Sequence, residues 1–309
     1  MYRLTLTRPH MARTRSGTAN CGGRNFTSTL RASARNPGRC RRSGFRSAAI
    51  LWAGVRSRHL RRPTSSLGAD NRRSPRQIGA ADHRAASRAG IAQRRVSEFG
   101  FGIPGGIFGV IAEQGKSDDL WMSVEQGVHN GRMLDDRLFG AASNPEAIVP
   151  SIEQFDFYSG CGIDITFLGM GEADRLGNVN VSHLAGNLIG PGGFMEIAQN
   201  AKKVVYCGTF DAQGSKVSWS HGRLTIVQPG KVHKFVHAVE RITFSADFAR
   251  KHGQEVLYIT ERAVFRLASE GLELIEVAPG IEIERDVLPY MEFRPLISAV
   301  GTMPAPVFE

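Results

Sequence analysis

A single carboxylate stands where an apolar segment ends. In WMSVEQG, residues 121–127, four largely apolar residues lead into Glu125, and Gly127 follows two positions later. Carboxylates are ionised at neutral pH, so one of them can act as a nucleophile without a general base. It then needs an activated carbonyl to attack and backbone N–H groups that stabilise the oxyanion. The pattern predicts covalent chemistry at Glu125, while a solvent-exposed acid just beyond a strand is the ordinary structural interpretation.

Two glycine-rich stretches could supply those N–H groups. They contain Gly100, Gly102 and Gly105 in GFGIPG, and Gly190, Gly192 and Gly193 in GPGG. Glycine leaves backbone N–H groups unobstructed by a side chain. Open α/β folds bind their ligands at the carboxyl ends of parallel strands. We therefore expect Glu125, Gly127 and these two turns to share one edge of a sheet.

The first glycine stretch also fits the G-x-G-x-x-G pattern of dinucleotide-binding turns. In that motif an apolar strand precedes the glycines, whereas AQRRVSEF, residues 92–99, has a composition that is poor for a strand. The acid expected further along is not clearly at a strand end. Three interpretations stay open: an NAD or FAD site, a tight turn selected for packing, and a loop lining an acyl-thioester site. The second is favoured over the first.

The chain from about residue 96 onward has the pattern of an α/β domain. Buried strands are expected at 118–125, 162–169, 202–208 and 254–260, and hairpins at 217–227 and 263–280. A helix should follow the glycine loop within 97–115, and others should cover 193–202, 246–252 and 281–288. Short apolar runs of this kind are typical of strands buried on both faces. The predicted fold is an open, mostly parallel sheet with flanking helices and antiparallel hairpins.

Charge divides the sequence into two parts of opposite sign. The whole chain has 39 Lys and Arg against 29 Asp and Glu, a net charge of +10. Residues 1–95 hold 22 Arg, no Lys and two acids, which gives +20; residues 96–309 then hold 17 basic and 27 acidic side chains, which gives −10. The basic character belongs to residues 1–95 alone. We expect no specific nucleic-acid partner.

Residues 1–95 are rich in Arg, Ser, Ala and Gly and lack a sustained helical or strand period, which predicts a disordered segment. An organellar leader, a phosphate-binding arm and a GC-rich gene translated out of frame are the three possible origins. The exclusive use of Arg over Lys favours the third. The apolar run at 47–55 is shorter than the ~20 residues of a membrane span. We expect a cytoplasmic protein.

Cysteine and histidine spacing indicates no metal or disulfide framework. The four cysteines, with no CxxC pair among them, are Cys21, Cys40, Cys161 and Cys207. Without a secretory signal they are expected to be free thiols in a reducing compartment. His233 and His237 have i, i+4 spacing, but the residues around them are strand-like. We expect no metal site.

The residues that follow Glu125 resemble a known family. SVEQG, together with residues 138–210 and 253–267, is similar to the second, glutamate-bearing half of the family I coenzyme A transferases. The resemblance is to the fused short-chain acyl-CoA:acetate or 3-ketoacid type. It covers the chain from about Phe99 to the C-terminus, and residues 1–95 show none.

The resemblance implies a ping-pong exchange of CoA between carboxylic acids. Glu125 would form first a mixed anhydride and then a γ-glutamyl-CoA thioester, with CoA as part of the substrate and no permanently bound cofactor or metal. The turn that resembles the family's CoA-contacting turn contains Gly190, Gly192 and Gly193. Gly127 and Gly102 are predicted at the substrate site from their place beside Glu125 and in the first glycine stretch. The implied partners are an acyl-CoA, a short-chain carboxylic acid, a first CoA-transferase domain or partner subunit, and further copies of the chain in a homo-oligomer.

The chain departs from the family pattern in three places, one of which is VHNGRMLDDRLFG, residues 128–140, where members have a Gly- and Pro-rich continuation. Gln126 stands where members commonly have Asn or Ser, and residues 1–95 take the place of the first domain of fused members, which leads us to expect a frameshift or truncation near residues 95–98. Two hypotheses follow. The chain is a transferase subunit built on Glu125, or it is a catalytically incompetent CoA-binding remnant that lacks the first domain.

Overall fold

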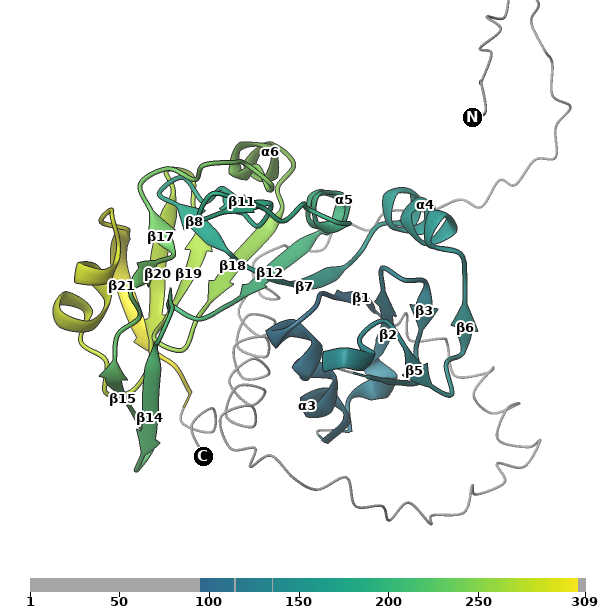
Figure 1. Ribbon diagram of the computed structural model, residues 1–309, viewed down its shortest axis with the longest axis horizontal. Helices are drawn as coiled ribbons and strands as arrows, with labels where there is room; N and C mark the ends of the chain where they lie inside the picture. The colour runs from purple at the N-terminus through teal and green to yellow at the C-terminus, as the bar shows by residue number, and fades with distance from the viewer. Residues whose placement is uncertain (1–94, 114, 135, 305–309) are drawn as a thin grey trace, which may run out of the picture. The chain divides into compact units, whose positions relative to one another are not determined.

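The computed structural model describes residues 95–113, 115–134 and 136–304 (Figure 1). The segment expected to be disordered lies outside the described residues except for Arg95, and so do Cys21 and Cys40. Arg95 is the first residue of β1 (Arg95–Phe99) and is therefore part of the folded region.

One mixed sheet of ten strands organises the fold, in the order β21-β20-β19-β18-β12-β7-β1-β2-β3-β6. Its five central strands are parallel: β18 (Glu255–Ile259), β12 (Lys203–Cys207), β7 (Ile165–Gly169), β1 and β2 (Leu120–Val124). The outer strands are β19 (Ala263–Leu267), β20 (Leu272–Val277), β21 (Leu296–Thr302), β3 (Val128–His129) and β6 (Ala147–Ile148). β19 and β20 continue the sheet antiparallel from β18, and β3 and β6 do so from β2. The predicted fold class is confirmed.

Within the described ranges, the remaining strands build five smaller sheets. They are β4 (Arg132–Met133) with β5 (Ala142–Ser143), β10 (His183–Leu184) with β11 (Asn187–Leu188), β13 (Asp211–Ala212) with β16 (Val232–His233), β14 (Lys216–Ser220) with β15 (Arg223–Gln228), and β17 (Phe235–Val236) with β8 (Glu172–Asp174) and β9 (Val179–Asn180).

Four α-helices accompany the central sheet in the described ranges: α3 (Ile107–Glu113), α4 (Ser151–Cys161), α5 (Phe194–Asn200) and α6 (Ala246–Lys251). Figure 1 shows α4, α5 and α6 along one side of the sheet and α3 on the other. Tighter and wider turns are η1 (Ile103–Gly106), η2 (Ser117–Asp119), η3 (Asp136–Leu138), the π-helix η4 (Ile283–Val287) and η5 (Leu288–Tyr290).

Aromatic packing shows which strand residues face which helices. Phe99 stacks on Phe167 at 5.1 Å between ring centroids and meets Phe108 of α3 at 4.5 Å. Because successive strand residues face opposite sides of a sheet, the neighbours Glu98 and Thr166 face the side covered by α4. On that side Phe194 of α5 stacks on Tyr206 of β12 at 5.8 Å.

Most predicted elements are confirmed, two predictions are wrong, and one helix was not predicted. Residues 92–99 were judged a poor strand, yet 95–99 form β1 at the centre of the sheet, because its Ser97, Glu98 and Phe99 find partners only after folding. Helix α4 was not predicted. The helix expected at 281–288 is instead the π-helix η4 followed by the 3-10 turn η5.

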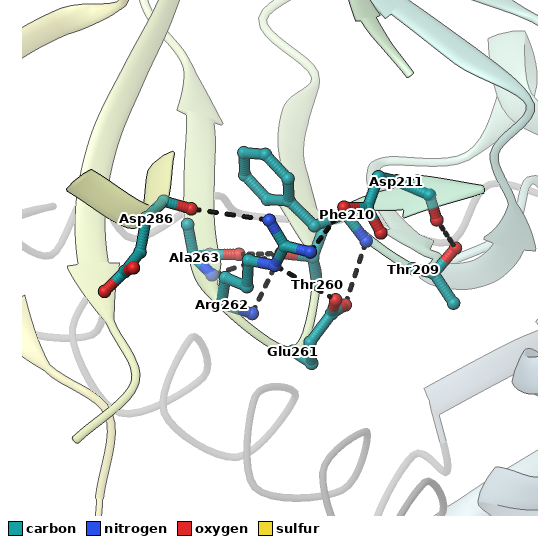
Figure 2. Close-up of polar contacts among 8 residues, drawn as sticks. All are labelled: Thr209, Phe210, Asp211, Thr260, Glu261, Arg262, Ala263 and Asp286. Atoms are coloured by element: carbon teal, nitrogen blue, oxygen red, sulfur yellow. Dashed lines mark hydrogen bonds and ion pairs between the residues drawn. The ribbon is translucent and has the colours of Figure 1, made fainter. Parts of the chain in front are cut away.

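A buried ionic cluster joins the end of β18 to the loop after β12. Arg262 is fully buried, and its guanidinium pairs with the carboxylate of Asp211 and donates a 3.4 Å hydrogen bond to the carbonyl of Asp286 (Figure 2). Its Nε lies 3.5 Å from Oε1 of Glu261, whose other oxygen accepts from the N–H of Phe210 at 2.9 Å. This cluster anchors the loop structurally, since Arg262 has no surface for a ligand to reach.

Candidate active site

Glu125 lies at the carboxyl end of β2, immediately after Val124. Its side chain is half-buried, unlike the fully buried Ser123 two residues earlier. The neighbouring parallel strands β1 and β7 end at the same edge, at Phe99 and Gly169. The predicted place of Glu125 is therefore confirmed: it is a carboxylate at the edge where open α/β folds bind ligands.

Gly193 is brought directly against this carboxylate. A Cβ built on Gly193 would lie 2.4 Å from Oε2 of Glu125 and 2.5 Å from Cζ of Phe155. Real Cβ atoms do not approach so closely, so a side chain at position 193 would force the Glu125 carboxylate and the Phe155 ring to move. Of the glycines predicted at the site, this one has the most direct contact with Glu125.

Gly127 shapes the turn that carries Glu125. Its φ of +92° is in the region that favours glycine, and a Cβ there would lie 2.0 Å from the carbonyl oxygen of Val149. Its N–H donates to the carbonyl of Val124 at 2.9 Å. The turn is also held by Ser151, whose hydroxyl donates to the Glu125 carbonyl at 3.3 Å. The visible role of Gly127 is thus to close the turn behind the carboxylate.

Gly190 and Gly192 form an open turn before α5. Their φ values are +86° and +54°, and a Cβ on either would meet no described atom within 4 Å. The N–H of Gly190 donates to the carbonyl of Ser182 at 3.1 Å, which ties one end of the turn to the preceding chain. The turn therefore has free space beside it, next to Gly193.

Gly102 reaches the site through a chain of contacts. It lies in the loop after β1 with a φ of +85° and open space among the described residues. Its neighbour Phe101 packs edge-on against Phe139 at 5.5 Å. The next residue, Gly140, lies against Gln126, whose amide donates to Oε1 of Glu125 at 3.4 Å. The loop therefore contacts Glu125 only indirectly, through Phe139, Gly140 and Gln126.

A buried polar row that the sequence did not predict lies on the face covered by α4. Glu98 is paired in register with Ser123 of β2 and Thr166 of β7, and all three are almost completely buried. The Thr166 hydroxyl donates to Oε2 of Glu98. From α4, Tyr158 donates to the Ser123 hydroxyl at 3.0 Å. Because residues 123 and 125 are two apart on the strand, Glu125 continues this row toward the edge.

Burial raises the pKa of Glu98 to about 8, partly offset by the Thr166 hydrogen bond and reinforced by the negative charge of Glu125. The Glu98 carboxyl is therefore largely protonated at neutral pH. Burial also raises the pKa of Tyr158, and the charges of Glu98 and Glu125 act in the same direction. The two carboxyls are thus electrostatically coupled, with Glu98 beneath and Glu125 at the edge.

Two buried side chains of metal-ligating type, His129 and Cys207, have structural roles. His129 is buried and accepts a 2.9 Å hydrogen bond from Trp121 at Nδ1, and burial lowers its pKa. Cys207 is a buried free thiol whose pKa is raised by burial. Within the described ranges, no three His, Cys, Asp or Glu side chains are grouped as metal ligands. Nor does any helix of that part of the chain have the length and apolar character to cross a membrane.

No protein-family model matches the sequence. The acetate CoA-transferase YdiF of Escherichia coli strain K12 is 44% identical over 203 residues, which cover 66% of this chain and 38% of YdiF. The caffeate CoA-transferase of Acetobacterium woodii is 41% identical over 205 residues, 65% of this chain and 39% of the relative. The chain is homologous to the CoA-transferases. It spans less than half the length of these curated relatives.

Solved CoA-transferase structures agree. The acyl-CoA transferase YdiF of E. coli O157:H7, determined as a thioester complex with CoA, matches with a TM-score of 0.67 and 40% identity over 74% of this chain and 43% of its own. Glutaconate CoA-transferase of Acidaminococcus fermentans shares the fold at 18% identity, with a TM-score of 0.52 over 73% of this chain and 88% of its own. The decarboxylase AibA/AibB does so at 17% identity, with a TM-score of 0.53 over 69% and 85%. The fold alone therefore does not decide the reaction.

Proposed function

We propose that this chain transfers CoA between a short-chain acyl-CoA and a carboxylate of the acetate or 3-ketoacid class, through a covalent intermediate on Glu125. The observation that carries the proposal is the contact between the Glu125 carboxylate and Gly193 at the carboxyl edge of the parallel strands. Homology to CoA-transferases supports the same reaction class.

The chemistry needs no metal and no net proton. A Glu125 carboxylate oxygen attacks the acyl carbon, the C–S bond breaks, and CoA leaves as a thiolate, which gives a mixed anhydride. The thiolate then attacks the glutamyl carbon, the C–O bond to the acyl group breaks, and the first acid leaves as a carboxylate. The γ-glutamyl-CoA thioester remains. A second carboxylate reverses both steps, so the energy of the thioester is kept.

The glycine turn before α5 fits the binding of the acyl-CoA. Gly193 places its backbone at the nucleophile, and the open turn at Gly190 and Gly192 leaves room for a thioester beside it. We assign the backbone N–H groups of Gly192 and Gly193 to the oxyanion of each tetrahedral intermediate, because the N–H of Gly190 donates to Ser182 and Pro191 has none. Gly127 and Gly102 act indirectly, by shaping the turn of Glu125 and the loop beside it. Binding energy from the long CoA chain would orient the reacting carbon.

A partner chain or domain fits the surface around Glu125. Four large apolar side chains near the site have about half or more of their surface exposed: Phe101 (69%), Ile148 (69%), Ile152 (78%) and Met195 (49%). Exposed apolar groups gathered beside a polar site are typical of an interaction surface. We propose that the part of the relatives that this chain does not span covers this surface, and a homo-oligomer remains a prediction.

A second candidate function is CoA binding without transfer. It is favoured by one observation, namely that this chain matches only 38–39% of its curated relatives. In this case the glycine turn would still bind CoA, while the pocket for the second acid would be incomplete. The two functions differ in turnover rather than in affinity.

Transfer of CoA from acetyl-CoA to isotopically labelled acetate distinguishes them. The full chain is assayed alone and with the separately produced part of E. coli YdiF that it does not span. Formation of labelled acetyl-CoA in either arm supports the transferase, provided that the Glu125→Gln variant forms none. CoA binding without label transfer in both arms supports the binding protein, and no CoA binding at all overturns both.

A further inference from the structure

Glu98 is a buried carboxyl that the transfer chemistry does not use. Only 1% of its surface is exposed, and burying a carboxyl in a strand is expensive unless it is protonated or paired with a positive charge. The neighbours that pair with it in register, Ser123 and Thr166, are hydroxyl residues. Protonation and hydrogen bonding therefore offset the free-energy cost of burying the Glu98 carboxyl.

The strand register places Glu98 on the strand beside the nucleophile, where the charges of the two carboxyls interact. Ser123 stands beside Glu98 in register, and Glu125 is two residues further along the same strand. The titratable groups that face Glu98 are Glu125 from the end of β2 and Tyr158 from α4. Tyr158 keeps its proton because burial raises its pKa, so the charge that changes in this row near neutral pH is that of Glu98.

We propose that Glu98 is a positioning residue whose uncharged carboxyl supports Glu125, and whose ionisation slows formation of the covalent adduct on Glu125. The inference rests on the proposed transferase function and extends it to the control of the nucleophile. It is specific to the buried row of Glu98, Ser123 and Thr166 under the edge of the sheet.

The physical reason is charge. Every species that reacts with Glu125 is anionic or becomes so: the oxyanion of each tetrahedral intermediate, the CoA thiolate and the acceptor carboxylate. An uncharged Glu98 leaves one negative charge in the pocket, whereas an ionised Glu98 adds a second and opposes each of these anions. A second negative charge nearby in a protein interior should slow the formation of these anions by about tenfold. Since the transfer consumes no net proton, a loss of rate at alkaline pH points to such a charge and not to a missing acid.

Substitution of Thr166 tests the ionisation of the Glu98 carboxyl independently. Its hydrogen bond stabilises the charged form of Glu98 and so lowers the pKa of that carboxyl against the effect of burial. Thr166→Val keeps the shape of the side chain and removes the donor. It should move the ionisation of Glu98 to higher pH without altering Glu125 itself.

The test is the rate of adduct formation on Glu125 from acetyl-CoA between pH 6.5 and 9.5, measured by intact mass on the full chain with its YdiF-derived partner. The wild type should slow by about tenfold with a midpoint near the Glu98 pKa of about 8. Glu98→Gln should abolish that fall, Thr166→Val should move it to higher pH, and Glu153→Gln on the exposed face of α4 should leave it in place.

The outcomes separate this inference from the proposed function. A wild-type adduct whose pH profile is unchanged in both Glu98→Gln and Thr166→Val overturns the role of Glu98 alone. Absence of any adduct in the wild type and all variants, at every pH, overturns the proposed function and the role of Glu98 with it. Loss of the fall in Glu98→Gln together with the shift in Thr166→Val supports the inference.

Discussion

The absence of a side chain at Gly193 is what lets the Glu125 carboxylate sit at the start of α5. A Cβ there would lie 2.4 Å from Oε2 of Glu125 and 2.5 Å from the Phe155 ring, closer than real side chains approach. The backbone of the glycine turn is thereby held against the nucleophile. This contact joins the GPGG stretch to the SVEQG stretch, although Gly193 and Glu125 are 68 residues apart in the chain (193 − 125).

Gly193→Ala should displace the Glu125 carboxylate and lower CoA transfer by at least about 100-fold, since misplacement of a reacting group by 1 Å can cost that much. Gly109→Ala is the matched control, because Gly109 is exposed in the middle of α3 with open space around it. There the change should stabilise the fold by about 0.5–1 kcal/mol. Steady-state transfer assays and urea unfolding of both variants give the comparison. Equal activity of Gly193→Ala and wild type would contradict the assigned contact.

Glu98→Gln should be more stable than the wild type, by an amount that grows with pH. The folded pKa of about 8 exceeds the ordinary value of 4.5, so between these values the unfolded chain has released the proton that the folded chain keeps. The contribution of Glu98 to stability is complete below pH 4.5, declines by up to about 1.4 kcal/mol per pH unit, and levels off above pH 8. Because Gln does not titrate, the variant does not lose this stability as the pH rises.

Urea unfolding of wild type, Glu98→Gln and the exposed control Glu153→Gln at pH 5, 7 and 9 measures this effect. The difference between wild type and Glu98→Gln should widen from pH 5 to pH 7 and beyond, whereas that for Glu153→Gln should stay constant. A constant difference for Glu98→Gln would mean that the carboxyl titrates normally in the folded protein.

Arg262→Met should destabilise the fold by about 3–5 kcal/mol, because it removes the guanidinium that pairs with the fully buried carboxylate of Asp211. Arg294→Met is the control, since Arg294 pairs with Glu284 on the surface, where such pairs contribute about 1 kcal/mol or less. Urea denaturation compares the two. Similar losses in both variants would show that the cluster in Figure 2 contributes no more than an exposed ion pair.

Much of the fold follows from local sequence pattern. The runs around Val124, Val205 and Leu257 are short and apolar, and Gly222 and Gly271 lie at tight turns, so the strands and hairpins were predictable. Strand β1 was not, because its polar Ser97 and Glu98 are buried only by pairing with β2 and β7. Helix α4 has no side-chain N-cap and mixes buried Gln154 with exposed Ile152, which hides its helical period.

The site was predictable only in part, for a related reason. Glu125 and the glycine turns stand out because a carboxylate after an apolar run and clustered glycines are unusual locally. Glu98 and Thr166 become a site only through the register of three strands, which no local pattern encodes. One local signal could have indicated Glu98: it is an acid just before the glycine loop, in SEFG, at the end of strand β1.

Mapping the adduct on the tryptic peptide 117–132 tests the central claim most directly. This peptide contains Glu125 together with Asp118 and Asp119, so fragmentation can assign a modification among three carboxyls. After incubation of the full chain with acetyl-CoA, in the presence of the partner segment, the account predicts a CoA thioester on Glu125 that hydroxylamine removes and that Glu125→Gln abolishes. An unmodified peptide, or a modification on Asp118 or Asp119 that persists in Glu125→Gln, would contradict it.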